Sequence, residues 1–402
     1  MNGITKSITF LKEYKQLKQA VDEGKTPVLA VGLSAIHKAH LAAALGLDTD
    51  RPVLVLTDDD NAANRFAADL RGFSERDIVQ LPSRELVMAD VVGVSRGYEQ
   101  RRLAALDELT EAHFAVASVQ AAAQRTMPPA LLASSIVTLK AGEEAPLDEL
   151  THRLTDAGYE RCSQVEGMGQ FSVRGGILDI FPPQAERPYR VEFWDDEIDS
   201  ISTFDVGSQR RLEQCETLRC LPCMEALPSL AKGGAAGLAK AVAALASSRR
   251  KKQHAELQKN LERDAERLRE SGTLPAADKY LPLIYPQMAT VFDYLPENTL
   301  ILIEDTPRLR DAARDFHARI ADDVTALMER GEMPGGMDGY ALDFAGICSI
   351  KRQIVRMDSF LNSIPELAPQ HLENFVANQM NAYGGNLDMA SADIRSYTEQ
   401  GR

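Results

Sequence analysis

A glycine and a lysine at the spacing of a nucleotide phosphate loop are the residues of this chain whose types and positions most suggest chemistry. In the pattern GxxxxGK[ST], backbone N–H groups wrap the phosphates, the lysine meets their charge and the hydroxyl holds magnesium. Gly32 and Lys38 stand at these positions, but His37 replaces the second glycine and Ala39 replaces the hydroxyl residue. A ring at His37 crowds the phosphate path, and Ala39 offers no magnesium ligand.

The second half of such a site would be an apolar strand that ends in two acids. The segment LILIED at 300–305 has this form, with Glu304 before Asp305. Nucleotide hydrolysis needs an acid for magnesium and another group to position water. The order expected for that task is Asp before Glu, so each carboxylate here has the wrong length for its place. We therefore expect a nucleotide-binding fold without nucleotide chemistry, with no cofactor and no catalytic residue.

The cysteines and histidines do not follow a metal-binding pattern. Cys215, Cys220 and Cys223 are close in sequence, but no second CxxC or histidine pair accompanies them. His37 and His40 share one side of a predicted helix without a nearby acidic or thiol partner. We expect free thiols, no metal and a cytoplasmic protein. No apolar run approaches the roughly 18 residues of a membrane span, and the N-terminus lacks a signal-peptide core.

Two parts of the chain alternate short apolar strands with helices, and the part between them does not. The alternation over residues 1–134 and 223–360 predicts one parallel sheet covered by helices, a degenerate phosphate-loop helicase-like α/β lobe. Residues 135–222 contain a helix and then alternating strands joined by Gly and Pro-Pro turns, which predicts an inserted antiparallel α+β domain. We expect residues 361–402 to be a linker and the start of a next domain.

The charge is concentrated in the predicted insertion. The chain has 402 residues and a net charge of −14. Residues 135–222 carry 9 basic and 17 acidic side chains, a net charge of −8. Because neutralising phosphate charge dominates nucleic-acid affinity, this segment is a poor candidate for a DNA surface. The basic run at 249–252 is expected to be the solvated start of a helix, with contact to DNA or to a later domain as the alternative.

The segment 169–213 closely resembles the UvrB-homology domain shared by UvrB and the transcription-repair coupling factor Mfd. The glycine pair after Arg174, the DIFPP turn, the FWDDEIDSI strand and the FDVGSQR stretch follow in family order. FDYLPENTLILIEDTP at 292–307 resembles the family's second nucleotide-motif strand. The resemblance covers roughly residues 1–360. It implies a fold with this domain inserted in a nucleotide-binding lobe.

Departures from the family pattern distinguish the two kinds of relative. UvrB has an intact phosphate loop, an Asp-Glu box and a tyrosine-rich hairpin, whereas residues 81–100 contain one tyrosine and no hairpin signature. With both nucleotide motifs degenerate, the chain resembles the N-terminal UvrB-homology module of the coupling factors. The resemblance implies a fragment, with RNA polymerase and double-stranded DNA bound by domains outside it. Residues 375–402 resemble the first strand and helix of a following domain.

Four side chains are predicted to share one face of the inserted domain. Alternation along the strands at 171–174 and 189–194 turns the apolar residues toward a core and leaves on the opposite face Arg174, Arg190, Glu192 and Trp194. Arg and Trp are enriched at interface hot spots. In the alternative, Arg190 and Glu192 line a solvated face and Trp194 packs on a neighbouring loop. In the family, the positions matching Arg174, Arg190 and Trp194 contact UvrA, so the resemblance implies that this face binds UvrA.

Three functions follow from these observations. The first is a non-catalytic module of a coupling factor that recruits UvrA to stalled transcription complexes in nucleotide excision repair. The second is a UvrB-like, ATP-dependent enzyme that handles damaged DNA, which His37, Ala39 and the reversed acids disfavour. The third is a regulatory clamp that keeps the motor or the UvrA-binding surface closed, and it is compatible with the first.

Overall fold

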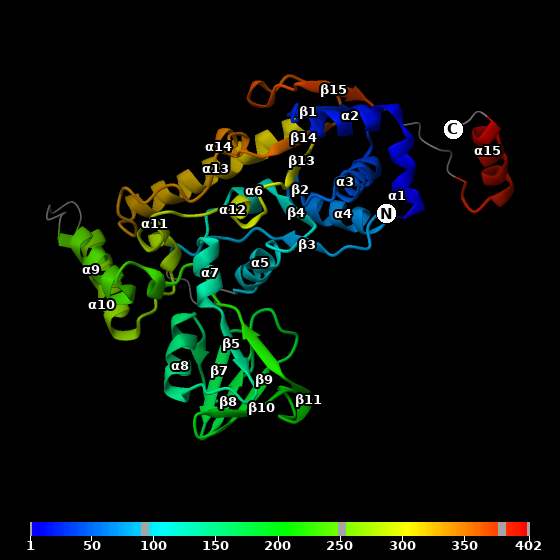
Figure 1. The fold of residues 1–402 in the computed structure, drawn as a ribbon. Coiled ribbons are helices and arrows are strands. Elements are labelled where there is room, and N and C mark those ends of the chain that lie inside the picture. The colour runs from blue at the N-terminus through cyan, green and yellow to red at the C-terminus, as the bar shows by residue number, and fades with distance from the viewer. Residues whose placement is uncertain (1, 90–95, 248–254, 377–382, 400–402) are drawn as a thin grey trace.

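The computed structural model describes residues 2–89, 96–247, 255–376 and 383–399. Residues up to 376 form an α/β lobe and a β domain projecting from it (Figure 1). Within these residues the lobe holds a seven-stranded sheet, in the order β15-β1-β14-β13-β2-β4-β3, and every neighbouring pair is parallel. The strands are β1 (Val28–Val31), β2 (Val53–Thr57), β3 (Ile78–Leu81), β4 (Phe114–Ser118), β13 (Leu300–Glu304), β14 (Gln353–Asp358) and β15 (His371–Asn374).

The order of the strands shows that the lobe is built from both sides of an insertion. β13 lies between β14 and β2, with Leu302 in register with Val55 on one side and Val355 on the other. The strands of the first 134 residues therefore meet those that follow the insertion in a single sheet. The prediction of one parallel sheet interrupted by an antiparallel insertion is confirmed.

Helices cover both faces of this sheet, and the sequence of the strands explains why. VLAV in β1 and VLVLT in β2 are apolar at every position or nearly so, and all of their residues are buried. On one face lie α1 (Gly3–Ser7), α2 (Lys12–Asp22), α3 (Ala35–Thr49) and α4 (Asp60–Arg71). On the other lie α5 (Gly97–Glu108), α6 (Val119–Ala123), α12 (Val291–Tyr294), α13 (Thr306–Glu329) and α14 (Phe344–Cys348). Strands buried on both faces are typical of a parallel sheet of this kind.

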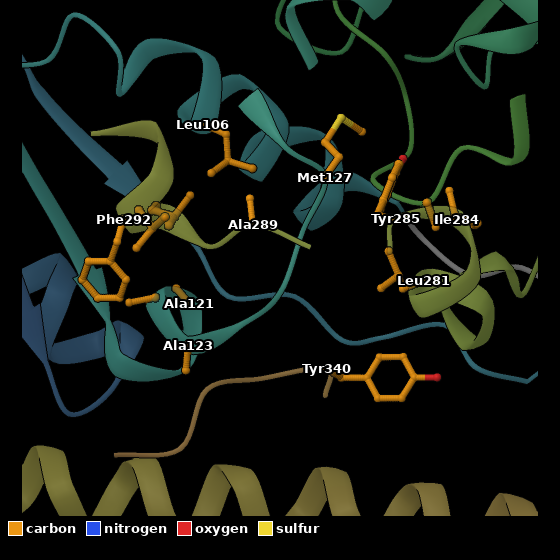
Figure 2. Close-up of a cluster of buried hydrophobic side chains, with 14 of the residues drawn as sticks. Leu106, Ala121, Ala123, Met127, Leu281, Ile284, Tyr285, Ala289, Phe292 and Tyr340 are labelled. Atoms are coloured by element: carbon orange, nitrogen blue, oxygen red, sulfur yellow. The ribbon is translucent and has the colours of Figure 1, made fainter. Parts of the chain in front are cut away.

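A cluster of buried apolar side chains joins the two parts of the lobe (Figure 2). Leu106 comes from α5, before the insertion, whereas Phe292 of α12 and Tyr340 come from after it. The Tyr294 hydroxyl donates a hydrogen bond to the Met127 carbonyl over 2.9 Å. Since one core contains side chains from both parts, neither part can bury its apolar surface alone.

The sheet of the lobe also includes a strand from residues 361–402, β15. β15 pairs in parallel with β1, and Asn374 is in register with Val31. This edge strand lies within residues 361–402, which we expected to be a linker and the start of a next domain. The sheet of the lobe thus continues past residue 360. After it, α15 (Leu387–Glu399) contains no buried residue.

The inserted domain is a mainly antiparallel sheet with one helix on its core face. Its six-stranded sheet has the order β11-β10-β9-β8-β7-β6, antiparallel except for the pair β6 and β7. β5 and β12 form a separate antiparallel pair. Leu150 and Leu154 of the helix α8 share the core with Phe171, Leu178 and Val191. The elements are β5 (Val137–Lys140), α8 (Leu147–Asp156), β6 (Glu160–Arg161), β7 (Gln170–Arg174), β8 (Ile177–Ile180), β9 (Tyr189–Trp194), β10 (Glu197–Phe204), β11 (Arg211–Cys215) and β12 (Thr217–Cys220).

A buried charge network lies where the inserted domain meets the lobe. Arg84 is buried and donates two hydrogen bonds to Asp278, of 2.6 Å and 3.0 Å. Its Nε lies 2.8 Å from a carboxylate oxygen of Glu225, a residue just past the insertion. The Glu225 N–H in turn donates to Glu99 of α5 over 2.8 Å. The network therefore fastens three segments that are far apart in the sequence.

Three of the remaining helices, α9 (Gly234–Ser247), α10 (Ala255–Ser271) and α11 (Leu281–Ile284), form an arm of the lobe (Figure 1). The fourth, α7 (Pro129–Ser135), lies between the lobe and the inserted domain and leads into β5 (Figure 1). Leu257, Leu261, Ala265 and Leu268 of α10 are buried, as the predicted apolar stripe requires. The basic run 249–252 lies outside the described residues. Among the described helices, none is both long enough and apolar enough to cross a membrane.

Candidate partner-binding surface

The loop that would bind nucleotide phosphates is short in this structure. α3 begins at Ala35, so only residues 32–34 separate it from β1. In the phosphate-loop pattern the four residues between the two glycines belong to the loop, but here Ala35 and Ile36 are helical. Gly32 has a φ of +81°, and a Cβ added to it would lie 2.0 Å from the carbonyl oxygen of Phe375. The chain's own backbone, just after β15, thus covers this turn.

The two acids at the end of β13 lie in different surroundings. Asp305 caps α13 and accepts hydrogen bonds from the Arg308 N–H (3.4 Å) and the Ser359 hydroxyl (3.3 Å). Burial raises the pKa of Glu304, and the nearby charge of Lys38 opposes that rise. Lys38 itself is 4% exposed. The predicted nucleotide residues therefore lie near one another at the carboxyl edge of the sheet, around a loop that is shorter than the phosphate-loop pattern.

The four predicted partner-binding residues lie on one face of the inserted domain, opposite its core. Arg174, Ile177 and Glu192 are in register across β7, β8 and β9. Asp179 and Arg190 are in register in the neighbouring row. Because cross-strand partners and residues two apart share a face, Arg174, Arg190, Glu192 and Trp194 project to the same side. The predicted alternation of these strands is confirmed.

Both arginines are held by a buried carboxylate that the sequence analysis did not include. The Asp179 side chain is 1% exposed. Its Oδ2 accepts hydrogen bonds from Arg174 Nη2 (2.8 Å) and Arg190 Nη2 (2.9 Å), and its Oδ1 accepts one from Arg190 Nε (2.7 Å). These bonds raise the pKa of the Arg190 guanidinium. We name Asp179, Arg174 and Arg190 the arginine–aspartate cluster.

The two arginines differ in how much of each remains open to a partner. The Arg174 side chain is 52% exposed, whereas that of Arg190 is 14% exposed. Arg190 also donates to the Gln209 carbonyl over 3.2 Å, and its guanidinium carbon lies 4.7 Å from the centre of the Phe204 ring. The alternative in which Arg190 lines a solvated face is therefore wrong.

Glu192 and Trp194 follow Arg190 along β9. Glu192 forms an ion pair with Arg211 of β11 and accepts a hydrogen bond from the Ser200 hydroxyl over 3.1 Å. Trp194 ends β9 at a two-residue turn and is 81% exposed. It does not pack on a neighbouring loop, as the alternative required. A large aromatic side chain so open to water, beside paired charges, is a typical component of an interface.

The cysteines remain without a metal-binding arrangement in the part of the chain that the structure describes. Cys220 and Cys223 are buried, and burial raises the pKa of both thiols, that of Cys220 to about 12. No group of three side chains able to hold a metal ion is found among the described residues. His40 stacks on Phe73 with ring centres 4.6 Å apart. These residues serve packing in this structure.

Comparison with known proteins identifies the inserted domain and the chain around it. Residues 137–225 match the family model described as the UvrB interaction domain. The chain is 30% identical over 403 aligned residues to the transcription-repair-coupling factor of Bacillus subtilis, an alignment that covers 97% of this chain. The chain carries the UvrB-homology module of the transcription-repair-coupling factors. This confirms the resemblance found in the sequence.

Coupling factors of other bacteria align with a smaller part of the chain. That of Haemophilus influenzae is 31% identical over 68% of this chain, and that of Escherichia coli is 31% identical over 74% of it. These alignments cover 24% and 25% of the two relatives, against 34% of the Bacillus subtilis factor. The chain thus spans about a third or less of the coupling factors it matches.

Proposed function

We propose that this module binds UvrA through the face that carries Arg174, Arg190, Glu192 and Trp194, and so links a coupling factor to nucleotide excision repair. The observation that carries the proposal is the exposed Trp194, which lies on the same face as the half-exposed Arg174 of a UvrB interaction domain. In the proposed role the module recruits UvrA to stalled transcription complexes. RNA polymerase and double-stranded DNA are proposed partners of the longer factor, through parts outside these residues.

The charge of the inserted domain supports a protein partner. Its net charge of −8 repels phosphate, so its arginines are poorly placed to attract DNA. A guanidinium suits a carboxylate, with which it forms two charge-assisted hydrogen bonds. Truncating a hot-spot residue costs about 2 kcal/mol or more, or roughly a thirtyfold loss of affinity.

Calorimetric titration of UvrA with this chain tests the proposal. We expect Arg174→Ala to weaken binding by roughly thirtyfold while the melting temperature stays within a few degrees. Arg153→Ala is the matched control, because Arg153 is an exposed arginine of α8, on the opposite side of the domain core. Equal affinities for the Arg174→Ala variant and the unmutated chain would reject Arg174 as a contact.

We also propose that the module performs no nucleotide chemistry. The short loop after β1 and the structural use of Asp305 support this proposal. Titration with magnesium-ATP should give no heat of binding. A micromolar dissociation constant that Lys38→Ala abolishes would instead favour the UvrB-like, ATP-dependent enzyme.

A further inference from the structure

We infer that Asp179 and Arg190 act as a support that fixes the guanidinium of Arg174 for a carboxylate of the partner. The inference rests on the proposed function and adds to it the chemistry of one contact. In this arrangement Arg174 touches the partner, and Asp179 and Arg190 are positioning residues.

The Asp179 carboxylate is suited to such a role because its hydrogen bonds all lead to the two arginines. It is almost completely buried, and both of its oxygens accept from a guanidinium. A buried carboxylate with these partners is held in one orientation, since any rotation would leave an unpaired charge away from water. Arg174 is therefore bonded to a group that does not move.

Arg190 completes the support from the other side. Its Nε and Nη2 hold Asp179, and its Nη1 donates to the Gln209 carbonyl. Its guanidinium lies over the ring of Phe204, which is buried. With these contacts inside the domain, Arg190 has little left to offer a partner. Arg190 therefore affects binding only by holding Asp179 in place.

Arg174 presents the free edge of its guanidinium to solvent. Only Nη2 has a hydrogen-bond partner among the described residues, so Nε and Nη1 remain available on a side chain that is 52% exposed. Nη2 carries two hydrogens and Asp179 takes one of them, so the other still forms, with the neighbouring N–H of Nη1 or Nε, an edge that a carboxylate can meet with two parallel N–H···O bonds. Fixing the planar group in advance lowers the entropy that the arginine loses on binding.

The neighbours of Arg174 define the rest of the contact. Glu192 is in the same cross-strand row, but its carboxylate pairs with Arg211 and so does not occupy the free edge of Arg174. Trp194 lies two residues further along β9 on the same face. The partner surface that fits is an acidic side chain next to an apolar one.

Replacing Arg174 by lysine tests the requirement for a fixed planar edge without disturbing buried groups. A lysine keeps the charge but has no fork that can bond Asp179 on one edge and a carboxylate on the other. We expect Arg174→Lys to lose about tenfold or more of the UvrA affinity, close to the loss in Arg174→Ala. Arg153→Lys, on the other side of the domain, should bind like the unmutated chain.

A double-mutant cycle with Asp179→Asn tests the positioning role itself. We expect Asp179→Asn to weaken UvrA binding by about tenfold when Arg174 is present, and by less than about threefold in the Arg174→Ala background. Asp148→Asn is the control, because it makes the same charge change on α8 at an exposed site. Emission from Trp194, the chain's only tryptophan, reports whether the face keeps its structure.

The outcomes separate this inference from the proposed function. If Arg174→Ala and Trp194→Ala both bind UvrA normally, the proposed function fails, whereas normal binding by Arg174→Ala alone overturns only this inference. If Arg174→Ala binds weakly but Arg174→Lys binds normally, charge alone is sufficient and the inference is overturned. Equal losses from Asp179→Asn in both backgrounds would also overturn it, since Asp179 would then act without Arg174. If Asp179→Asn unfolds the domain, the UvrA affinities of Arg174→Lys and Arg174→Ala test the inference instead.

Discussion

At the scale of single residues, only part of the arginine–aspartate cluster follows directly from the alternation of one strand. The alternation of YRVEFW is enough to put Arg190, Glu192 and Trp194 on one face. The partner Asp179 needs one more step, the pairing of β8 with β7 across the turn Gly175–Gly176, where Arg174 is in register with Ile177. A two-residue Gly-Gly connection predicts that register, so Asp179 was accessible to sequence reasoning that followed the hairpin to its second strand.

The two arginines should differ in their effect on stability. Arg190→Ala removes two of the three hydrogen bonds of a buried carboxylate, and we expect it to cost about 1–3 kcal/mol of the free energy of unfolding. Arg174→Ala removes one bond from a half-exposed side chain and should cost less than about 1 kcal/mol. Urea denaturation of both variants measures this, and a larger loss for Arg174→Ala would contradict the assignment of roles.

At the scale of elements, the strands of the lobe were predictable and the edge strand β15 was not. β1, β2, β4 and β13 are continuous apolar runs, the mark of strands buried on both faces. The sequence HLEN of β15 has no such pattern, and Leu372 is 44% exposed. What places this strand is its backbone pairing with β1 and the close approach of Phe375 to Gly32. Neither leaves a local signal in the sequence.

Gly32→Ala tests whether this close approach holds β15 in place. Gly32 and Gly142 have nearly the same positive φ, +81° and +82°, but a Cβ on Gly142 would meet nothing within 4 Å. Both substitutions should carry the cost of a left-handed backbone, about 1 kcal/mol. Only Gly32→Ala adds a clash with the Phe375 carbonyl. We expect faster hydrogen exchange of β15 amides in Gly32→Ala than in Gly142→Ala, and equal exchange would contradict the account.

At the scale of the whole molecule, buried charges and a shared core join parts that the sequence keeps far apart. Arg84, Glu225 and Asp278 are the kind of residues that a sequence analysis assigns to the surface. Their burial follows from the return of the chain after the insertion, which no local pattern records. The lobe and the insertion could be predicted from the apolar patterns of their strands, whereas the buried charge contacts between distant segments could not.

Removing Arg84 should destabilise the molecule strongly. Arg84→Ala would leave the carboxylates of Asp278 and Glu225 buried beside one fewer positive charge, and breaking such a pair costs about 3–5 kcal/mol. Arg101→Ala, at an exposed arginine of the same region, should cost less than about 1 kcal/mol. Thermal unfolding compares them, and similar midpoints for the two variants would show that the network is not needed for stability.

The proposal that this face binds UvrA is tested most directly at Trp194. Because the side chain is 81% exposed, Trp194→Ala should leave the melting temperature unchanged, so a loss of affinity reports the contact itself. Met168→Ala, at a residue that is 47% exposed in the same domain, is the control. In titrations with UvrA we expect Trp194→Ala to bind roughly thirtyfold more weakly than the unmutated chain. Unchanged affinity in Trp194→Ala would contradict the central claim.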